Sequence, residues 1–266
     1  MKFLDYLKNN IVLFDGGMGT LLQSKGLKAG EYPERWNITH ADDIKGVHKA
    51  YYDAGSNVVT TNTFGANILK FSEEELDAII KSAIDNAVKA QEESVSEKEK
   101  FVALDIGPTG KLLKPLGDLD FEDAVNVFAK TVKLGAKYGA DLVIIETMND
   151  SYETKAALLA VKENCDLPVI VSNAYGEDRK LMTGADPETM AAILEGMGAD
   201  VIGANCSLGP KQLSPVMEKL LECSSVPVIV QPNAGLPEIV DGKTVTDCCP
   251  TNLRARLKNL LKRALG

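Results

Sequence analysis

The chain has 266 residues, with 29 Lys plus Arg against 38 Asp plus Glu and a formal net charge of −9. This acidic balance excludes a general binder of nucleic-acid backbones. The apolar fraction of 45% and the charged fraction of 25% exclude disordered and collagen-like chains. No apolar run approaches the roughly 20 residues of a membrane helix, and the N-terminal MKFLDYLKNN has no signal-peptide core. We therefore expect a cytoplasmic protein with no membrane and no nucleic-acid partner.

Seven short runs rich in Val and Ile predict strands that are covered on both faces. They are residues 11–16, 57–63, 101–107, 141–147, 168–175, 200–207 and 226–235. Amphipathic patterns predict helices over residues 41–54, 72–94, 121–138, 151–164, 187–197 and 210–223. These repeated βα units favour a single α/β domain over residues 1–266, a (β/α)8 TIM barrel. The competing open doubly wound sheet is disfavoured because no complete glycine-rich dinucleotide fingerprint follows a strand.

Polar residues gather where the predicted strands end. The ends read DGGMGT (15–20), TTNTF (60–64), DIGPT (105–109), ET (146–147), SNAY (172–175), NCS (205–207) and QPNAG (231–235). In a parallel barrel, the loops that follow the strands all open on one rim, where the chemistry takes place. The sequence therefore predicts a shared polar site at this rim.

The cysteines form an odd set and make a poor disulfide framework. They are Cys165, Cys206, Cys223, Cys248 and Cys249. Reduced thiols or thiolate ligands are favoured, and zinc prefers thiolates in tetrahedral geometry. From the residues alone, an adjacent cysteine pair is more often inert than metal-binding. We expect Cys165 and Cys223 to be small buried side chains, and His40 and His48 to have structural roles.

Six motifs occur in an order and spacing that resemble the homocysteine S-methyltransferases, above all the homocysteine-binding module of cobalamin-dependent methionine synthases. They are FDGGMGT (14–20), TNTFGA (61–66), DIGPTG (105–110), ET (146–147), GANC (203–206) and PNAG (232–235). The resemblance extends over about residues 10–245. It implies a zinc-dependent methyltransferase of methionine biosynthesis on a (β/α)8 barrel.

The resemblance also implies three zinc ligands, which match Cys206, Cys248 and Cys249. These cysteines are the expected metal-binding and catalytic residues. Homocysteine would be activated as a zinc-bound thiolate, because binding to a Lewis acid removes the thiol proton at neutral pH. The thiolate would then accept an activated methyl group and yield methionine.

Substrate-binding residues follow from the same resemblance. For the amino group of homocysteine the matching residues are Asp15 and Glu146, and for its carboxylate the backbone amides around Gly16, Gly17 and Thr20. Thr61, Asn62 and Phe64 are expected in the pocket wall, and Asn205 and Asn233 beside the metal. The simpler structural interpretations stay open: Asp15 anchoring its glycine-rich turn, Glu146 pairing with a lysine, and Asn233 stabilising a turn.

The segment after the seventh predicted strand departs from the family pattern. Only the 12 residues LPEIVDGKTVTD (236–247) separate Gly235 from Cys248. A parallel crossover alone needs a dozen or more residues, so the seventh helix and eighth strand are expected to be shortened or missing. Residues 236–266 then form an atypical closing segment, either an irregular or antiparallel closure that brings the cysteine pair to the rim, or a barrel left open at that edge. An open edge favours the alternative function, a catalytically silent barrel that serves as a binding or interaction scaffold.

The methyl donor cannot be read from the chain. No cobalamin-binding stretch or folate barrel is present in these 266 residues. The resemblance therefore favours methylcobalamin or another methylcorrinoid supplied by a partner protein or by folate and cobalamin domains outside this sequence. S-methylmethionine, betaine and a methylated thiol stay open as donors. A phosphate-sugar barrel enzyme is disfavoured because no glycine-rich phosphate loop follows the last strands.

Overall fold

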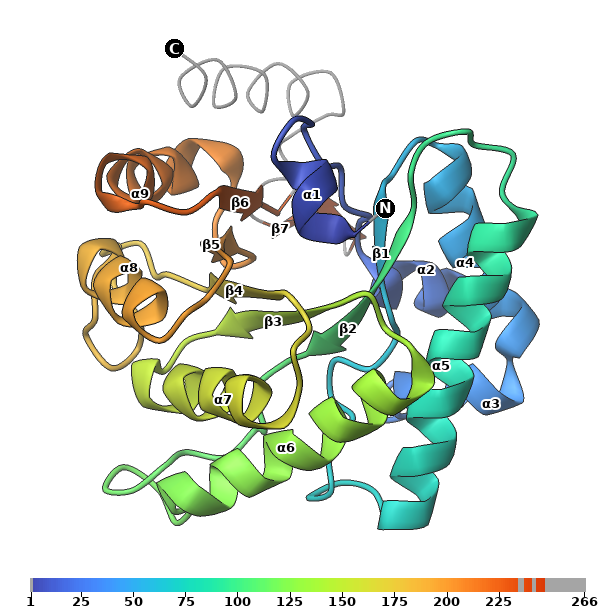
Figure 1. Cartoon of the computed structure of the whole chain (residues 1–266), viewed down its shortest axis with the longest axis horizontal. Helices are drawn as coiled ribbons and strands as arrows, with labels where there is room; N and C mark the ends of the chain where they lie inside the picture. The colour runs from blue at the N-terminus through green and yellow to red at the C-terminus, as the bar shows by residue number, and fades with distance from the viewer. Residues whose placement is uncertain (1, 234–236, 241–242, 247–266) are drawn as a thin grey trace. The chain divides into compact units, whose positions relative to one another are not determined.

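The computed structural model describes residues 2–233, 237–240 and 243–246 (Figure 1). The fold is α/β, and the strand order of its main sheet is β1-β2-β3-β4-β5-β6, the order of the chain. The chain divides into two compact units, Met1–Ile144 with Leu159–Val169, and Ile145–Leu158 with Ile170–Gly266.

The first unit packs helices against two parallel strands. Its elements are α1 (Phe3–Leu7), α2 (Met18–Ser24), η1 (Pro33–Arg35), α3 (Trp36–Thr39), α4 (Ala41–Asp53), β1 (Val58–Thr60), α5 (Glu73–Glu93), β2 (Phe101–Ile106) and α6 (Phe121–Tyr138). β1 pairs with β2 in parallel, with Val58 opposite Phe101. The helices α4 and α5 lie side by side (Figure 1). Burial of their apolar faces beside β1 and β2 forms a core around Tyr52, Val59 and Val102.

Helix boundaries in this unit follow the capping residues. The α5 helix begins after Ser72, whose hydroxyl accepts the backbone N–H of Glu75 at 3.2 Å. The α6 helix ends at Gly139, which has a φ of 90° that a residue with a side chain rarely adopts. The helices predicted over residues 41–54, 72–94 and 121–138 are thereby confirmed.

The strand predicted over residues 11–16 is wrong, because only Phe14 forms an isolated parallel bridge to Val58. Asp15 N donates to the carbonyl of Val58 at 3.0 Å, but Thr60 N donates to the Asp15 carboxylate, at 2.8 Å, instead of to a carbonyl. A side chain thus replaces the next backbone partner and ends the pairing. The two following glycines lead into α2, which the sequence patterns did not predict.

The second unit continues the alternation of strands and helices. Three elements have residues in both units: β3 (Leu142–Met148), α7 (Ser151–Asn164) and β4 (Val169–Asn173). They are followed by α8 (Pro187–Gly196), β5 (Val201–Asn205), α9 (Pro210–Cys223) and β6 (Val228–Gln231). β4 pairs in parallel with β5, and β5 with β6. The helices α8 and α9 lie next to each other (orange in Figure 1). The last three predicted helices and the last six predicted strands are thus found, most of the strands shorter than expected.

An antiparallel pair follows β6, with β7 (Pro237–Val240) and β8 (Lys243–Thr246) paired so that Val240 is opposite Lys243. This pair forms a sheet of its own, separate from the six-stranded sheet, and both expected closures stay open. Cys248 and Cys249 lie outside the described residues.

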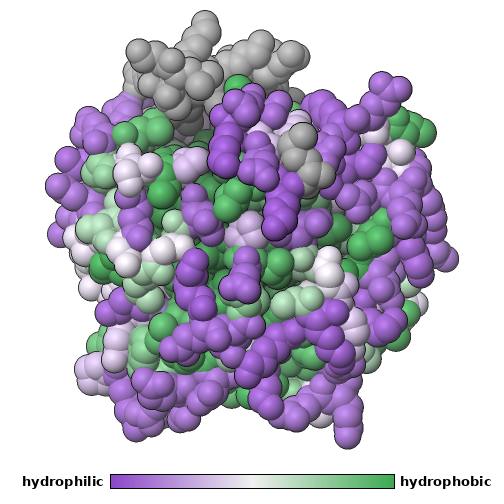
Figure 2. All heavy atoms as spheres, viewed as in Figure 1, coloured by the Kyte–Doolittle hydropathy of each residue, from purple (hydrophilic) through white to green (hydrophobic). Residues whose placement is uncertain are grey.

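Hydrophilic side chains cover much of the face in view in Figure 2. No helix among the described residues is long and apolar enough to cross a membrane.

Two cysteines differ from expectation. Cys223 is exposed and Cys165 only partly buried, because each follows or ends a helix at the surface, where its thiol donates to a carbonyl one turn earlier.

Candidate functional site

Asp15 joins the glycine-rich turn to the end of β1. Its carboxylate accepts the backbone N–H of Thr60 at 2.8 Å and faces the Thr60 hydroxyl at 3.2 Å. The side chain is partly buried. Asp15 thus anchors its turn, and its negative charge lies at the C-terminal end of a parallel strand.

The glycines after Asp15 permit a close approach of Tyr51. A Cβ added at Gly16 would meet the Tyr51 hydroxyl at 2.9 Å, and that hydroxyl donates to the carbonyl of Gly17 at 3.3 Å. Gly17 precedes α2 with no side-chain cap, and Thr20 lies exposed in the first turn. The sequence around the turn therefore presents backbone rather than side chains.

The polar groups of the loop after β1 bond to one another and to neighbouring segments. The Thr61 hydroxyl lies 2.7 Å from that of Thr63 and accepts the backbone N–H of Asp105 at 3.1 Å. Asn62 is buried and donates to the carbonyl of Pro33 at 2.7 Å. Phe64 is 42% exposed, and its ring lies against Gly107, where an added Cβ would meet it at 2.5 Å. Of these three predicted wall residues, only Phe64 presents a large exposed surface.

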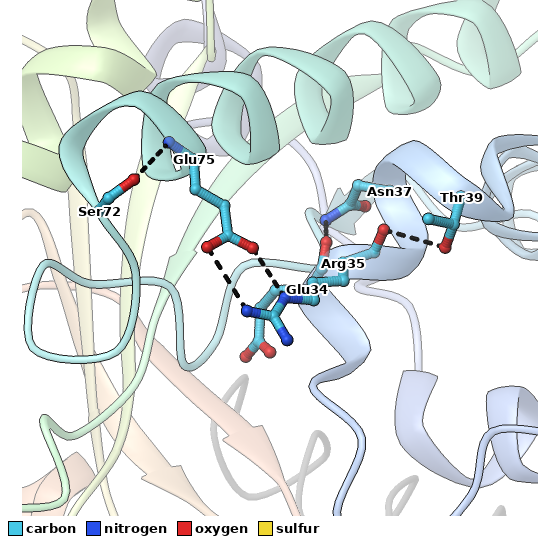
Figure 3. A network of polar contacts seen from close by, with 6 residues as sticks. All are labelled: Glu34, Arg35, Asn37, Thr39, Ser72 and Glu75. Carbon is cyan, nitrogen blue, oxygen red and sulfur yellow. Dashed lines mark hydrogen bonds and ion pairs between the residues drawn. The ribbon is translucent and has the colours of Figure 1, made fainter.

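Residues 33–39 hold this loop in place through hydrogen bonds. Asn37 donates to the carbonyls of Glu34, at 2.8 Å, and Asn62, at 2.7 Å. The buried Glu34 carboxylate accepts the backbone N–H of Gly65 at 2.8 Å. Figure 3 shows the neighbouring Arg35 guanidinium facing the Glu75 carboxylate, at 2.7 Å, at the start of α5. The loop conformation is therefore fixed by contacts that no sequence motif predicts.

In the second unit, four side chains from three strand ends form one hydrogen-bonded cluster. The Asn205 side-chain oxygen accepts from the Thr147 backbone N–H at 2.9 Å and from the Ser172 hydroxyl at 2.8 Å. Its nitrogen donates to the Thr147 hydroxyl at 2.8 Å and to the Cys206 sulfur at 3.3 Å. Asn205 is 1% exposed, so its polar atoms are used within the protein.

The backbone at this cluster adopts a conformation rare for residues with side chains. Thr147 has a φ of 59°, Cys206 of 55° and Ser207 of 54°. Such residues cost about 1–3 kcal/mol each and persist where surrounding contacts fix them. β5 ends at Asn205, immediately before the positive φ angles of Cys206 and Ser207. Cys206 N still donates to the carbonyl of Gln231 at 3.0 Å.

Burial dominates the electrostatics of Glu146 and Cys206. It raises the pKa of the Glu146 carboxyl to about 7. It also raises the pKa of the Cys206 thiol, as does the charge of Glu146, whereas the hydrogen bonds from Thr147 and Asn205 lower it. A nearby cation would favour the ionised form of each group. An ammonium group would do so for the Glu146 carboxylate, and a metal ion for the Cys206 thiolate.

A family model described as homocysteine S-methyltransferase matches residues 12–265. The chain belongs to this family. The match continues past residue 245, where the expected resemblance ended, and includes Cys248 and Cys249.

Two curated relatives and two solved structures are similar to this chain over most of its length. The methionine synthases of Mycobacterium leprae and Mycobacterium tuberculosis are 28% and 29% identical over 88% of this chain. The chain spans only 21% of the length of each. The metallated form of the homocysteine methyltransferase MmuM from Escherichia coli aligns with a TM-score of 0.76 and 22% identity, covering 86% of either chain. Its oxidized form aligns with a TM-score of 0.80 and 21% identity, covering 97% of this chain and 90% of that one. These alignments show that the fold is shared.

Of the three expected metal ligands, Cys248 and Cys249 lie outside the described residues. No group of three potential metal-binding side chains occurs within the described residues. Of the three expected ligands, Cys206 is described, and its partly buried sulfur, supported by two hydrogen-bond donors, fits a thiolate ligand for a soft metal ion. Asn233 is partly buried, and its backbone N–H donates to the carbonyl of Leu208 at 3.1 Å.

Sequence reasoning did not assign a role to Thr147 or Ser172. Thr147 is half of the ET motif, and Ser172 ends a predicted strand, so both were visible as strand-end residues. Their shared contact with Asn205 depends on the registers of neighbouring strands, which residue patterns do not give.

Proposed function

We propose that the chain is a zinc-dependent homocysteine S-methyltransferase, or the homocysteine-binding module of a larger methionine synthase. The family match over residues 12–265 carries this proposal. The cluster around Cys206 supports it, because a sulfur that receives two hydrogen bonds is suited to act as an anionic ligand. We also propose that residues 1–266 form one homocysteine-binding domain of the (β/α)8 type with a shortened last unit.

Cys206, Cys248 and Cys249 would hold the zinc ion. When bound, zinc acts as a Lewis acid that lowers the pKa of a coordinated thiol and makes homocysteine sulfur nucleophilic at neutral pH. At Cys206, the protein supplies two hydrogen-bond donors to the ligand sulfur, the Asn205 amide and the Thr147 hydroxyl. Asn233 follows β6, the strand that pairs with β5, and is proposed to orient a ligand beside Cys206.

Homocysteine recognition is assigned to charged groups and backbone amides. Asp15 and Glu146 would bind the ammonium group, because a carboxylate beside a cation is favoured in its ionised form. A bound ammonium would therefore release the proton that burial of Glu146 retains near pH 7. The amides of residues 16–20 would bind the substrate carboxylate. Thr61, Asn62 and Phe64 would form the pocket wall, with Phe64 supplying the exposed apolar surface.

We propose a methylcorrinoid as the methyl donor, presented by a separate protein or by further domains. The relatives named methionine synthase, of which this chain matches 21%, support this choice over betaine or S-methylmethionine. We also propose the cytoplasmic location that is expected from the sequence.

The decisive experiment measures zinc and methionine in the same preparation. The chain, purified without chelator, should contain about one zinc ion and bind homocysteine in a calorimetric titration only when zinc is present. Methionine formation is then assayed with methylcobalamin, S-methylmethionine and betaine in turn. Cys206→Ser should lose both zinc and homocysteine binding.

Each outcome separates the proposed enzyme from the alternative scaffold. Zinc-dependent homocysteine binding with methionine formed from methylcobalamin supports the proposal. Methionine formed only from another donor overturns the choice of donor but still supports a homocysteine methyltransferase. A folded chain that binds neither zinc nor homocysteine indicates a catalytically silent scaffold.

A further inference from the structure

The side-chain amide of Asn205 has only one orientation that satisfies its neighbours. The backbone N–H of Thr147 can only donate, and it lies 2.9 Å from the Asn205 oxygen. That contact fixes which end of the amide is the oxygen, and the Ser172 hydroxyl donates to the same atom at 2.8 Å. The amide nitrogen must therefore face the Thr147 hydroxyl and the Cys206 sulfur.

The direction of these hydrogen bonds continues to the sulfur. The Thr147 hydroxyl oxygen accepts from Asn205, so its own proton is free to point to the Cys206 sulfur, 3.7 Å away. Cys206 thus faces one N–H donor and one O–H donor. Two donors from residues of β3 and β5 therefore restrict the position of the sulfur.

Burial and backbone conformation make this arrangement rigid. Ser172 is fully buried and Asn205 is 1% exposed, so water does not compete for their hydrogen bonds. Thr147 and Cys206 both have positive φ angles, which need surrounding contacts to persist. The Asn205 amide contacts both of these residues and therefore connects the two strained positions.

We propose that Asn205 is a positioning residue rather than a substrate contact: held by Ser172 and the Thr147 backbone, it fixes the Cys206 sulfur as a hydrogen-bond acceptor ready for a metal ion. The proposal rests on the proposed function in one respect, that Cys206 is a metal ligand. Substitution of residues that orient a ligand commonly lowers metal affinity by about 10–100-fold.

Asn205→Asp tests the proposal with almost no change in shape. It replaces the N–H donor by an oxygen, so the sulfur loses a hydrogen bond and faces a negative charge. Asn173→Asp is the matched control: Asn173 is fully buried in the adjacent strand β4, and its amide donates to Met148 and Thr154. Two quantities are measured in the full chain, zinc affinity by chelator competition and, without metal, the rate of Cys206 alkylation by iodoacetamide, read by peptide mapping.

We expect Asn205→Asp to weaken zinc binding about 10–100-fold and to slow alkylation severalfold, with changes below about threefold for the control. If Asn205→Asp does not fold, Thr147→Val decides. It removes one donor to sulfur and keeps the β-branched shape, and Thr154→Val, which loses a hydroxyl bonded to Asp150, is its control. Equal effects of variant and control on both quantities overturn the proposal. A wild-type chain that binds no zinc refutes the proposed function, while the alkylation rates still decide the role of Asn205.

Discussion

The Asp15 carboxylate accepts the backbone N–H of Thr60 at 2.8 Å, where the pairing between residues 11–16 and β1 stops. One side chain therefore ends a strand pair and places a negative charge at the strand end. Anchoring the turn and binding a substrate ammonium need different properties of this group. The first needs an acceptor oxygen, and the second needs the charge.

Two substitutions at Asp15 separate these roles. Asp15→Ala removes the acceptor of a partly buried N–H and should lower the free energy of unfolding by about 1–3 kcal/mol, measured by urea denaturation. Asp15→Asn keeps an acceptor oxygen, so its stability should stay within about 1 kcal/mol of wild type, while its homocysteine affinity should fall at least about tenfold. Asp5→Ala, which removes an exposed ion pair with Lys8, should change stability by less than about 0.5 kcal/mol. Unchanged homocysteine affinity in Asp15→Asn would leave Asp15 with only the anchoring role.

The helices and most strands could be predicted because their signals are local. The predicted α6 is bounded by Asp120 and Gly139, an N-cap position and a C-terminal glycine, and its observed range is the predicted one. The strand over residues 11–16 has the same apolar pattern as the others. It fails because a carboxylate, not a carbonyl, meets Thr60, which depends on a contact 45 residues away in the chain.

The site was predictable as a set of strand ends but not as a network. Asn205 and Cys206 were visible as polar residues after an apolar run. Their hydrogen bonds require the positive φ of Thr147, and threonine is among the residues least expected in that conformation, so no sequence pattern predicts it. Contacts among β3, β4 and β5 are needed to select it.

Gly203, the first residue of the GANC motif, is required by the adjacent strand. A Cβ at this position would meet the carbonyl oxygen of Ile229 at 2.1 Å, a contact that the backbone of β6 must move to relieve. Gly203→Ala should lower the free energy of unfolding by about 1–3 kcal/mol in urea denaturation. At Gly196, in α8, an added Cβ has no atom within 4 Å, and Gly196→Ala should be neutral or stabilise by up to about 1 kcal/mol. Equal stabilities of the two variants would contradict this account.

Glu146 should make the metal-free protein less stable as the pH rises. Burial raises its pKa to about 7 in the folded state, whereas the unfolded carboxyl titrates near 4.5. Between these values the folded state binds more protons than the unfolded state, so stability falls with increasing pH. Glu146→Gln should remove up to about 3 kcal/mol of this fall, seen by comparing urea unfolding of variant and wild type at pH 4.5 and 7.5. Parallel pH profiles of the two proteins would refute the claim that titration of Glu146 causes this fall in stability.

His48 should have the opposite effect on the acid side. It is fully buried in α4, neither ring nitrogen has a hydrogen-bond partner among the described residues, and burial lowers its pKa to about 4 from an ordinary value of 6.5. Between these two values the unfolded state binds the extra proton, so stability is lost as the pH falls from 6.5 to 4. The loss reaches about 3 kcal/mol at the lower limit. His48→Leu removes both the titration and the unpartnered nitrogens, so the variant should gain stability relative to wild type as the pH falls. Urea unfolding at pH 7.0, 5.5 and 4.5 measures the difference, and a difference that does not change with pH would show that His48 is hydrated or paired in solution.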